Sequence, residues 1–228
     1  MLVVMPQIFN SYRLLAHLPL FQGMSASELD HVIEKMRLDF SKVEAGKVIV
    51  AEGERVDKLR FIIRGDVCAE TMADDKGYSI KETLNVPCML QIERLFGLSQ
   101  YYSTTFYAES ECQILSISKA DLVELATMSE VFRLNMMNIL CAMTQKSQRQ
   151  PWHTQPSGIR QKIFMFIKDR TLRPAGRKEV NIGMVRLGKE IAESRLNVSK
   201  ELRLLQAEGL IEMKKNKIII PALEKILC

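Results

Sequence analysis

The spacing of apolar and polar positions changes twice along the first two thirds of the chain. Between about residues 10 and 38, apolar residues recur every three or four positions, which predicts short helices. Ser25 and Glu28 form a capping-box start for one of them. From Phe40 to about Ile117, short apolar stretches alternate with glycine-containing turns, which predicts an antiparallel β-roll or jelly roll. From about Lys119 to Lys146 the period is helical again.

The long helix predicted over residues 119–150 is apolar on two sides. One stripe has the spacing of a coiled-coil seam and consists of Phe132, Met136, Ile139 and Met143. A second stripe consists of Leu134, Met137 and Cys141. One face can cover the β-roll and the other can meet a second copy, which predicts a homodimer; burial of both faces in one larger core is the alternative. The sequence leaves open which face forms the dimer.

The last third of the chain has the order of a winged helix-turn-helix. Pro151, Pro156 and Gly158 predict a hinge over residues 151–158. The amphipathic helix IRQKIFMFIKDR follows, and then two shorter helices, of which the second begins at the N-cap Ser194 and ends at Gly209. The stretch LIEMKKNKIII then alternates around a lysine-rich turn, as a β-hairpin does.

The second of the short helices has the composition of a helix that reads DNA. Val198, Leu202 and Leu205 form its inward stripe, and polar or basic residues cover the remainder. In this motif the second helix enters the major groove, and basic residues hold phosphates. The predicted DNA contacts are Ser194, Arg195, Leu196, Asn197, Ser199, Lys200 and Arg203 on the helix, with Lys214, Lys215 and Lys217 on the wing.

The charge distribution agrees with this interpretation. Residues 1–150 hold 16 Lys+Arg and 19 Asp+Glu, a net −3, while residues 151–228 hold 16 and 8, a net +8; together they give the +5 of the whole chain. A basic C-terminal part favours a polyanionic partner, here double-stranded DNA. The alternative is a ligand-binding signalling module whose helical domain contacts a protein partner.

Two stretches of the sequence, one beginning at residue 194 and one over residues 44–67, resemble motifs of the CRP/FNR family of bacterial transcription regulators. SRLNVSKEL followed by EGLI (from residue 194) is similar to the family's S-R-x-x-V-S-R-x-L and E-G-L-I, and EAGKVIVAEGERVDKLRFIIRGDV (44–67) is similar to its β-roll signature. The resemblance implies an α+β chain with a cyclic-nucleotide-binding-like sensor over 1–118, a dimerisation helix over 119–150, a hinge over 151–158 and a winged helix-turn-helix over 159–228. It also implies a homodimeric regulator that works with RNA polymerase.

This sequence departs from the family pattern in the recognition helix. Leu196 stands where many members carry an acidic residue, and Lys200 stands in place of the second arginine. Leucine can contact a thymine methyl group but cannot accept a hydrogen bond from cytosine. A different DNA target is therefore expected.

The effector cassette departs further. Members that bind cyclic nucleotides have G-E-[LIA] and, about ten residues later, R-[ST]-A, whose arginine binds the phosphate. Here Gln91 and Ile92 stand at the first motif, and Tyr102 and Ser103 stand at the second. A one-residue shift supplies Glu93 but no arginine. Because a buried phosphate without a cationic partner is costly, the sequence argues against cyclic AMP. The candidate effector pocket consists of these five residues.

Other cofactors and activities have little support in the sequence. Five scattered cysteines argue against an iron–sulfur cluster, a metal site or a disulfide framework, and favour a reducing, cytoplasmic setting. His17, His31, His153, the cysteines and the methionines could ligate heme but form no heme motif. No nucleophile elbow, P-loop or HExxH motif is present, so we expect no enzyme. No apolar run reaches the roughly 20 residues of a membrane span, and MLVVM lacks the features of a signal peptide.

Overall fold

The computed structural model describes residues 12–36, 38–149 and 156–227. It is a mixed α+β structure, and as the sequence predicts, antiparallel pairing joins β1 to β8, β8 to β3, β3 to β6, β5 to β9, β9 to β11 and β11 to β10. The chain divides into two compact units. Unit 1 comprises Met1–Val67, Asn85–Tyr102 and Ala108–Arg149; unit 2 comprises Cys68–Leu84, Ser103–Tyr107 and Gln150–Cys228.

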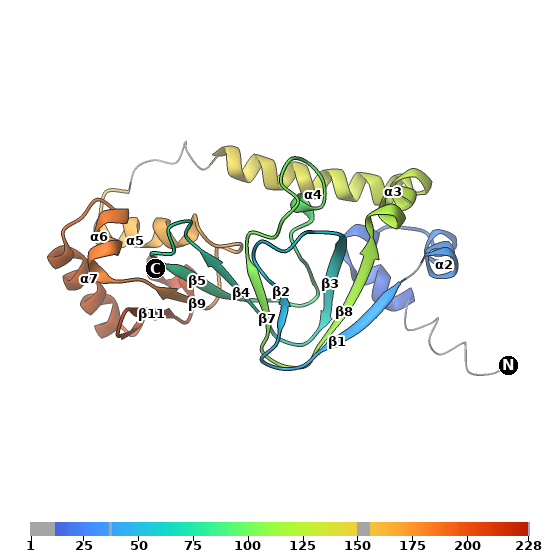
Figure 1. The fold of residues 1–228 in the computed structure, drawn as a ribbon. Helices are drawn as coiled ribbons and strands as arrows, with labels where there is room; N and C mark the ends of the chain where they lie inside the picture. Colours follow the sequence, from blue (N-terminus) through green and yellow to red (C-terminus); the bar gives the residue numbers. More distant parts are fainter. Residues whose placement is uncertain (1–11, 37, 150–155, 228) are drawn as a thin grey trace. The chain divides into compact units, whose positions relative to one another are not determined.

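Unit 1 contains a sheet with the strand order β1-β8-β3-β6 (Figure 1). These strands are β1 (Asp39–Val43), β8 (Cys112–Ser118), β3 (Lys58–Arg64) and β6 (Cys88–Met89); β2 (Val48–Val50) belongs to the same unit. The register places Phe40 opposite Leu115, and Leu115 opposite Phe61. Directly opposed side chains share a face, so these three point to one side of the sheet.

Helices cover that side of the sheet. They are the helical residues 12–17, η1 (Pro19–Phe21), α2 (Ala26–Lys35), α3 (Lys119–Met128) and α4 (Glu130–Arg149); η2 (Ile92–Arg94) is a short turn elsewhere in the unit. The ring of Phe21 lies 6.2 Å from that of Phe61 and 5.4 Å from that of Phe132. The predicted capping box is confirmed: Ser25 accepts from the Glu28 N–H, and the Glu28 carboxylate accepts from the Ser25 N–H.

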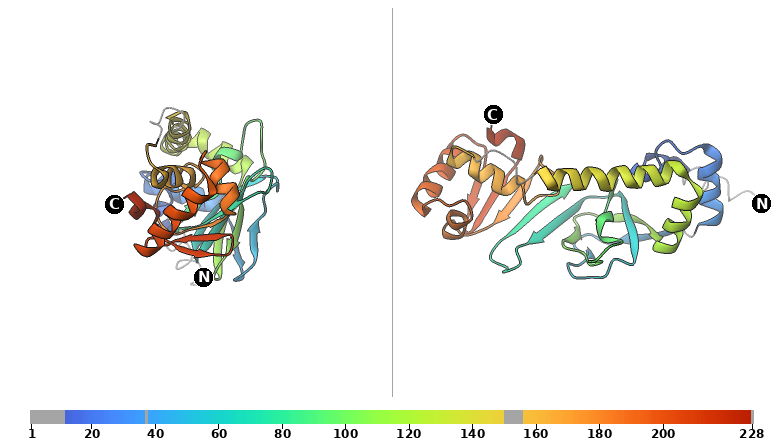
Figure 2. Two further views of the ribbon diagram at one scale, coloured as in Figure 1. Left: turned by 90° about the vertical axis from the view of Figure 1, so that its left-hand side faces the viewer. Right: turned by 90° about the horizontal axis from the view of Figure 1, so that it is seen from above.

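The long helix predicted over 119–150 is two helices, with a change of direction between α3 and α4 (Figure 2). Ser129, buried at 3% exposure, adopts an extended conformation between them. Its hydroxyl accepts from the Phe132 N–H at 3.3 Å and donates to Glu28 at 2.6 Å. Serine competes with the helical backbone in this way, which explains why α3 ends and α4 begins here.

The structure corrects the assignment of Phe132 to a dimer seam. Its side chain is fully buried against Phe21 of the same chain, and the neighbouring Asn135 donates to the carbonyls of Leu20 and Gln22. The other members of that stripe, Met136 and Ile139, are half-buried, and Met143 is exposed. The stripe covers the chain's own core because the helical residues of the N-terminal segment pack under α4. The second stripe, with Leu134, Met137 and Cys141, is the exposed one.

Unit 2 is built on a sheet with the strand order β10-β11-β9-β5-β4-β7. The strands are β4 (Val67–Met72), β5 (Ser79–Leu84), β7 (Thr105–Ala108), β9 (Lys178–Asn181), β10 (Glu212–Lys214) and β11 (Lys217–Ile220). The helices are α5 (Ile159–Lys168), α6 (Met184–Glu190), α7 (Arg195–Ala207) and η4 (Leu223–Leu227). The two short helices and the hairpin predicted from the sequence are present.

The units do not follow the expected border at residue 118. Hairpin β4–β5 and strand β7 belong with the C-terminal part, because β5 pairs along β9. Residues 151–155 of the predicted hinge lie outside the described residues.

Candidate nucleic-acid interface and effector site

Helices α6 and α7 are joined by a turn that requires glycine at one position. A Cβ atom on Gly188 would lie 2.7 Å from the Glu193 carbonyl oxygen, closer than real Cβ contacts come. The Gly188 carbonyl accepts from the Glu193 N–H at 2.8 Å, and Ala192 takes a left-handed conformation at φ 54°. Glycine at residue 188 therefore lets the chain turn tightly into α7.

Ser194 is the N-cap of helix α7, as predicted, and the Ser194 hydroxyl accepts from the Asn197 N–H at 3.1 Å. Val198, Leu202 and Leu205 are fully buried. They anchor α7 in an apolar core formed by the α5, α6 and α7 helices and the sheet. The inward stripe predicted from the sequence is confirmed.

Outside this stripe the surface of α7 is largely basic and exposed. Arg195, Ser199 and Arg203 are four residues apart and so form one stripe, with Leu196 and Lys200 beside it. Within the described residues no ion pair engages Arg195, Lys200 or Arg203, and Leu196 is 79% exposed. A face with free cations and an unpacked leucine can meet phosphates, base edges and thymine methyl groups.

Asn197 lies differently from the other predicted contacts. Its side-chain amide is 3.5 Å from a carboxylate oxygen of Glu193 in the turn that precedes α7. It is therefore directed toward the turn and away from the stripe of Arg195 and Ser199.

Ion pairs that the sequence did not predict join helix α5 to α7 and to the turn that precedes α7. Arg160 donates to Glu201 at 2.9 Å and to Glu208 at 2.6 Å, and Lys162 donates to Glu193 at 2.6 Å. The hydrogen bonds to Glu208 and then Glu201 raise the pKa of Arg160, and the bond from Lys162 lowers the pKa of Glu193. The sequence signal was weak: alternating charges on two amphipathic helices do not say which charges meet.

The wing is a hairpin with residues 215 and 216 at its tip. Lys214 pairs with Glu212 at 3.2 Å, and Lys217 pairs with Glu179 at 2.6 Å. No ion pair of Lys215 occurs among the residues the structure describes, and its side chain is exposed. Of the three predicted wing contacts, Lys215 is thus the most available to a phosphate.

The predicted effector residues occupy two different places. Gln91 is buried in a left-handed conformation at φ 39°, directly before η2, which carries Ile92 and Glu93. One carboxylate oxygen of Glu93 is buried and lacks a hydrogen-bond partner in the described part of the chain. Burial raises the pKa of Glu93, against a smaller lowering by Arg94. Tyr102 ends one segment of unit 1, whereas Ser103 begins a segment of unit 2.

Tyr102 is 1% exposed, and its hydroxyl accepts from Arg60 at 2.9 Å. The Arg60 guanidinium also lies 3.3 Å from Glu54 and 3.7 Å from Asp57. The residue at the family's arginine position therefore binds an arginine from β3, and two carboxylates neutralise that arginine. Burial raises the pKa of Tyr102.

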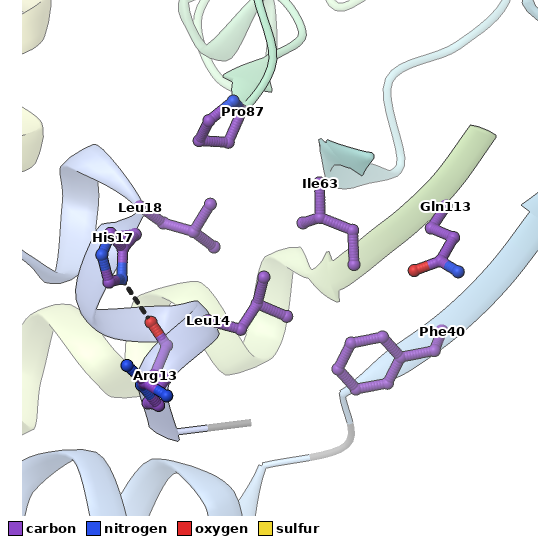
Figure 3. A pocket seen from close by; sticks show the side chains of 8 residues that line it. All are labelled: Arg13, Leu14, His17, Leu18, Phe40, Ile63, Pro87 and Gln113. Carbon is purple, nitrogen blue, oxygen red and sulfur yellow. Dashed lines mark hydrogen bonds between the residues drawn. The ribbon is translucent and has the colours of Figure 1, made fainter. Parts of the chain in front are cut away.

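A cavity of about 590 Å³ lies on the helix-covered side of the unit 1 sheet, the side that bears Phe40 (Figure 3). It is lined by Arg13, Leu14, His17, Leu18, Phe40, Ile63, Pro87 and Gln113. The side chains of Leu14, Phe40 and Ile63 converge on it. Phe40 shares a face with Phe61, and Arg60 is the neighbour of Phe61 on the strand, so Arg60 and Tyr102 belong to the opposite face. The structure brings none of the predicted effector residues into this cavity.

The cysteine and histidine side chains considered as cofactor ligands lie on several different elements. Cys68, Cys88 and Cys112 are buried cysteines outside any disulfide, and Cys141 is an exposed one. Within the described ranges, no three His, Cys, Asp or Glu side chains are grouped as a metal site. His17 donates from Nδ1 to the Arg13 carbonyl at 2.6 Å, and His153 lies outside the described residues.

Comparison with known proteins bears directly on the front part of the chain. Residues 40–129 match the family model of the cyclic nucleotide-binding domain. This match confirms the part of the sequence resemblance that concerns the β-roll. A protein of Rhodopseudomonas palustris named as a potassium channel is 26% identical over 117 residues, which are 49% of this chain and 26% of that protein. The chain thus spans about a quarter of the length of this curated relative.

Two solved structures are similar to this chain over different shares of its length. The sensor domain of the transcriptional regulator DNR from Pseudomonas aeruginosa is 16% identical, with a TM-score of 0.53, over 67% of this chain and 99% of that one. The catabolite activator protein of Thermus thermophilus is 18% identical, with a TM-score of 0.48, over 92% of this chain and 98% of that protein's chain. The likeness to the DNR sensor shows a shared fold. No helix within the described residues has the length and apolar character of a membrane span.

Proposed function

We propose that this chain is a sequence-specific DNA-binding transcription regulator that acts as a homodimer and is controlled by a small molecule other than cyclic AMP. One observation carries the proposal: helix α7 presents Arg195, Lys200 and Arg203, exposed and without ion pairs in the described structure, outside its buried stripe. The match of residues 40–129 to the cyclic nucleotide-binding domain supports a ligand-controlled sensor. The similarity to the sensor of a transcriptional regulator agrees with it.

The geometry around Tyr102 supports an effector other than cyclic AMP. A cyclic phosphate needs a cation that is free to bind it, whereas Arg60 is engaged by Glu54, Asp57 and the Tyr102 hydroxyl. Removing Arg60 from these partners would leave carboxylates facing the phosphate. RNA polymerase would be the further partner of the DNA-bound dimer.

DNA reading is tested with Arg195→Ala. The binding sequence is first selected from a random duplex pool with the wild-type protein, and affinities are then measured by fluorescence anisotropy. We expect Arg195→Ala to lose about 1–3 kcal/mol of affinity for the selected duplex, as expected of an arginine that pairs with guanine. Arg64→Ala is the matched control, because Arg64 is an exposed arginine of β3 in unit 1. Equal binding by both variants, or no preferred duplex, would favour the alternative of a helical domain that contacts a protein.

The effector proposal is tested by calorimetric titration with cyclic AMP and cyclic GMP. We expect no heat of binding at concentrations that saturate ordinary cyclic-nucleotide sensors. Saturable binding of either nucleotide that disappears in Arg60→Ala would contradict the proposal and would make Arg60 the phosphate ligand.

A further inference from the structure

Strand β5 pairs along strand β9, although the two strands come from opposite halves of the sequence (Figure 1). The register places Ser79 opposite Asn181 and Glu82 opposite Lys178. Ile80, 2% exposed, belongs to the same apolar core as the buried stripe of α7. Hairpin β4–β5 is therefore a layer of the winged-helix unit.

Glu82 is the polar centre of this layer. Lys178 Nζ lies 2.9 Å from its carboxylate, and the two side chains are 0% and 3% exposed. The carboxylate also accepts from the N–H groups of Leu172 (2.6 Å) and Arg173 (3.1 Å), and Lys178 donates to the Ala175 carbonyl. A buried pair whose partners are all hydrogen-bonded defines one geometry, and removal of either partner leaves an uncompensated charge.

The hairpin also holds the end of helix α5. The Tyr78 ring lies 5.4 Å from the Phe166 ring, and its hydroxyl accepts from Arg170 Nε at 2.8 Å. Leu172 and Arg173, the partners of Glu82, follow closely after the same helix. Helix α5 in turn holds α7 through Arg160. A continuous set of contacts thus joins β5 to the recognition helix.

We propose that Glu82 is a positioning residue for the recognition helix: through Lys178 and α5 it fixes the orientation in which α7 meets DNA, and release of β5 from β9 lowers sequence-specific binding. This inference rests on the proposed DNA-binding function. On its other side β5 adjoins β4, and β4 adjoins β7, the strand that follows Tyr102 and Ser103.

The structural half of the proposal is tested by hydrogen exchange in the full-length protein. Glu82→Gln and Lys178→Met each leave one buried partner unpaired, whereas the double variant removes both charges. In each single variant we expect exchange to speed up about tenfold in β5, β9 and the end of α5 together, because these segments open as one unit. The double variant should lie closer to wild type. Lys42→Met, which removes an exposed pair with Glu111, is the control. Faster exchange confined to β5 overturns the proposal.

The functional half is tested with a reversible lock in the Glu82→Gln background. Ser79→Cys with Asn181→Cys places two thiols on directly opposed residues of antiparallel strands, whose typical Cβ separation of about 4.5–5.5 Å is near the range that a disulfide spans. We expect the ratio of affinities for the selected and a random duplex to be near wild type when the lock is oxidised. It should fall about tenfold when dithiothreitol reduces the lock. Equal ratios in both states overturn the proposal.

The two failures are distinguishable. If the wild-type protein prefers no duplex, the proposed function is wrong, and the exchange experiment still decides whether β5, β9 and α5 open together. Wild type treated with the same oxidant and reductant controls for the natural cysteines, of which Cys141 is exposed.

Discussion

At the scale of single residues, Glu93 carries the clearest pH dependence. It is the predicted effector residue with a buried, unpartnered carboxylate oxygen, and burial raises its pKa above the ordinary 4.5. The folded protein therefore holds a proton that the unfolded chain releases. Stability declines as pH rises from about 4.5 through the raised pKa, and at neutral pH the fold bears the cost of the buried charge.

Glu93→Gln tests this cost. We expect the free energy of unfolding at pH 7 to rise by about 1 kcal/mol, because the amide is neutral and nearly the same shape. The difference from wild type should vanish below about pH 4.5. Urea unfolding at pH 4 and pH 7 measures both values, with the exposed Glu34→Gln of α2 as the control. A variant less stable than wild type at pH 7 would mean that the charged carboxylate has a favourable partner.

Residue-level predictions from the sequence succeeded where periodicity was the signal. Val198, Leu202 and Leu205 are all buried because helical spacing fixes which side chains share a face. The approach of Asn197 to Glu193 was not predicted, since it depends on the shape of a turn. Likewise, the Arg60–Tyr102 bond joins residues 42 positions apart, and no local pattern indicates it.

At the scale of elements, the tight turn between α6 and α7 predicts a sharp difference between two glycines. Gly188→Ala brings a Cβ atom to 2.7 Å from the Glu193 carbonyl, whereas Gly158→Ala meets nothing within 4 Å. We expect Gly188→Ala to lower the free energy of unfolding by about 1–3 kcal/mol. That loss corresponds to roughly 2–4 °C in Tm per kcal/mol. Gly158→Ala should leave Tm almost unchanged. Thermal unfolding of both variants is the measurement. Equal Tm values would show that the backbone of the turn shifts to accommodate the Cβ atom at little cost.

The wing predicts different salt dependences for two of its lysines. Lys215 is exposed and outside any described ion pair, whereas Lys217 is held 2.6 Å from Glu179. Lys215→Ala should therefore reduce the slope of log affinity against log salt by about 1, the effect of one lost phosphate contact. Lys217→Ala should change it less. Anisotropy titrations over about 50–200 mM salt give the slopes. A larger change for Lys217 would mean that Glu179 releases it on DNA.

Elements were predicted well where the sequence marks their ends, and less well where long-range pairing decides. Helices α6 and α7 and the hairpin β10–β11 follow from Ser194, Gly209 and the alternation beyond it. The break at Ser129 was missed because the flanking residues keep a helical period. The pairing of β5 with β9 joins residues such as Glu82 and Lys178, which are 96 positions apart. The sequence of either strand does not indicate which other strand it pairs with.

At the scale of the whole molecule, the exposed stripe of α4 predicts the dimer contact. Leu134 and Met137 are 47% and 51% exposed on this helix, while Phe132 is buried in its own chain. A second copy of α4 would cover these side chains in a coiled-coil contact. Met137→Asp should therefore shift the protein from dimer to monomer, because a charge in the seam loses its hydration.

Light scattering and native mass spectrometry measure the oligomeric state. Val123→Asp is the matched control, since Val123 is a 54% exposed apolar residue of α3 outside the α4 stripe. Dimer loss with Val123→Asp and not with Met137→Asp would move the contact to α3.

Strand β5 comes from the first half of the sequence but pairs with β9 of the C-terminal part, which limits where the chain can be divided. A fragment of residues 156–228 alone would lack strand β5 of its sheet, and β9 would become an exposed edge with unpaired backbone groups, the kind of edge that pairs with other chains. Exchange of sensors between related proteins would meet the same obstacle, because the piece to be transferred is interleaved with the piece to be kept. Modularity here follows the sheet and not the order of the sequence.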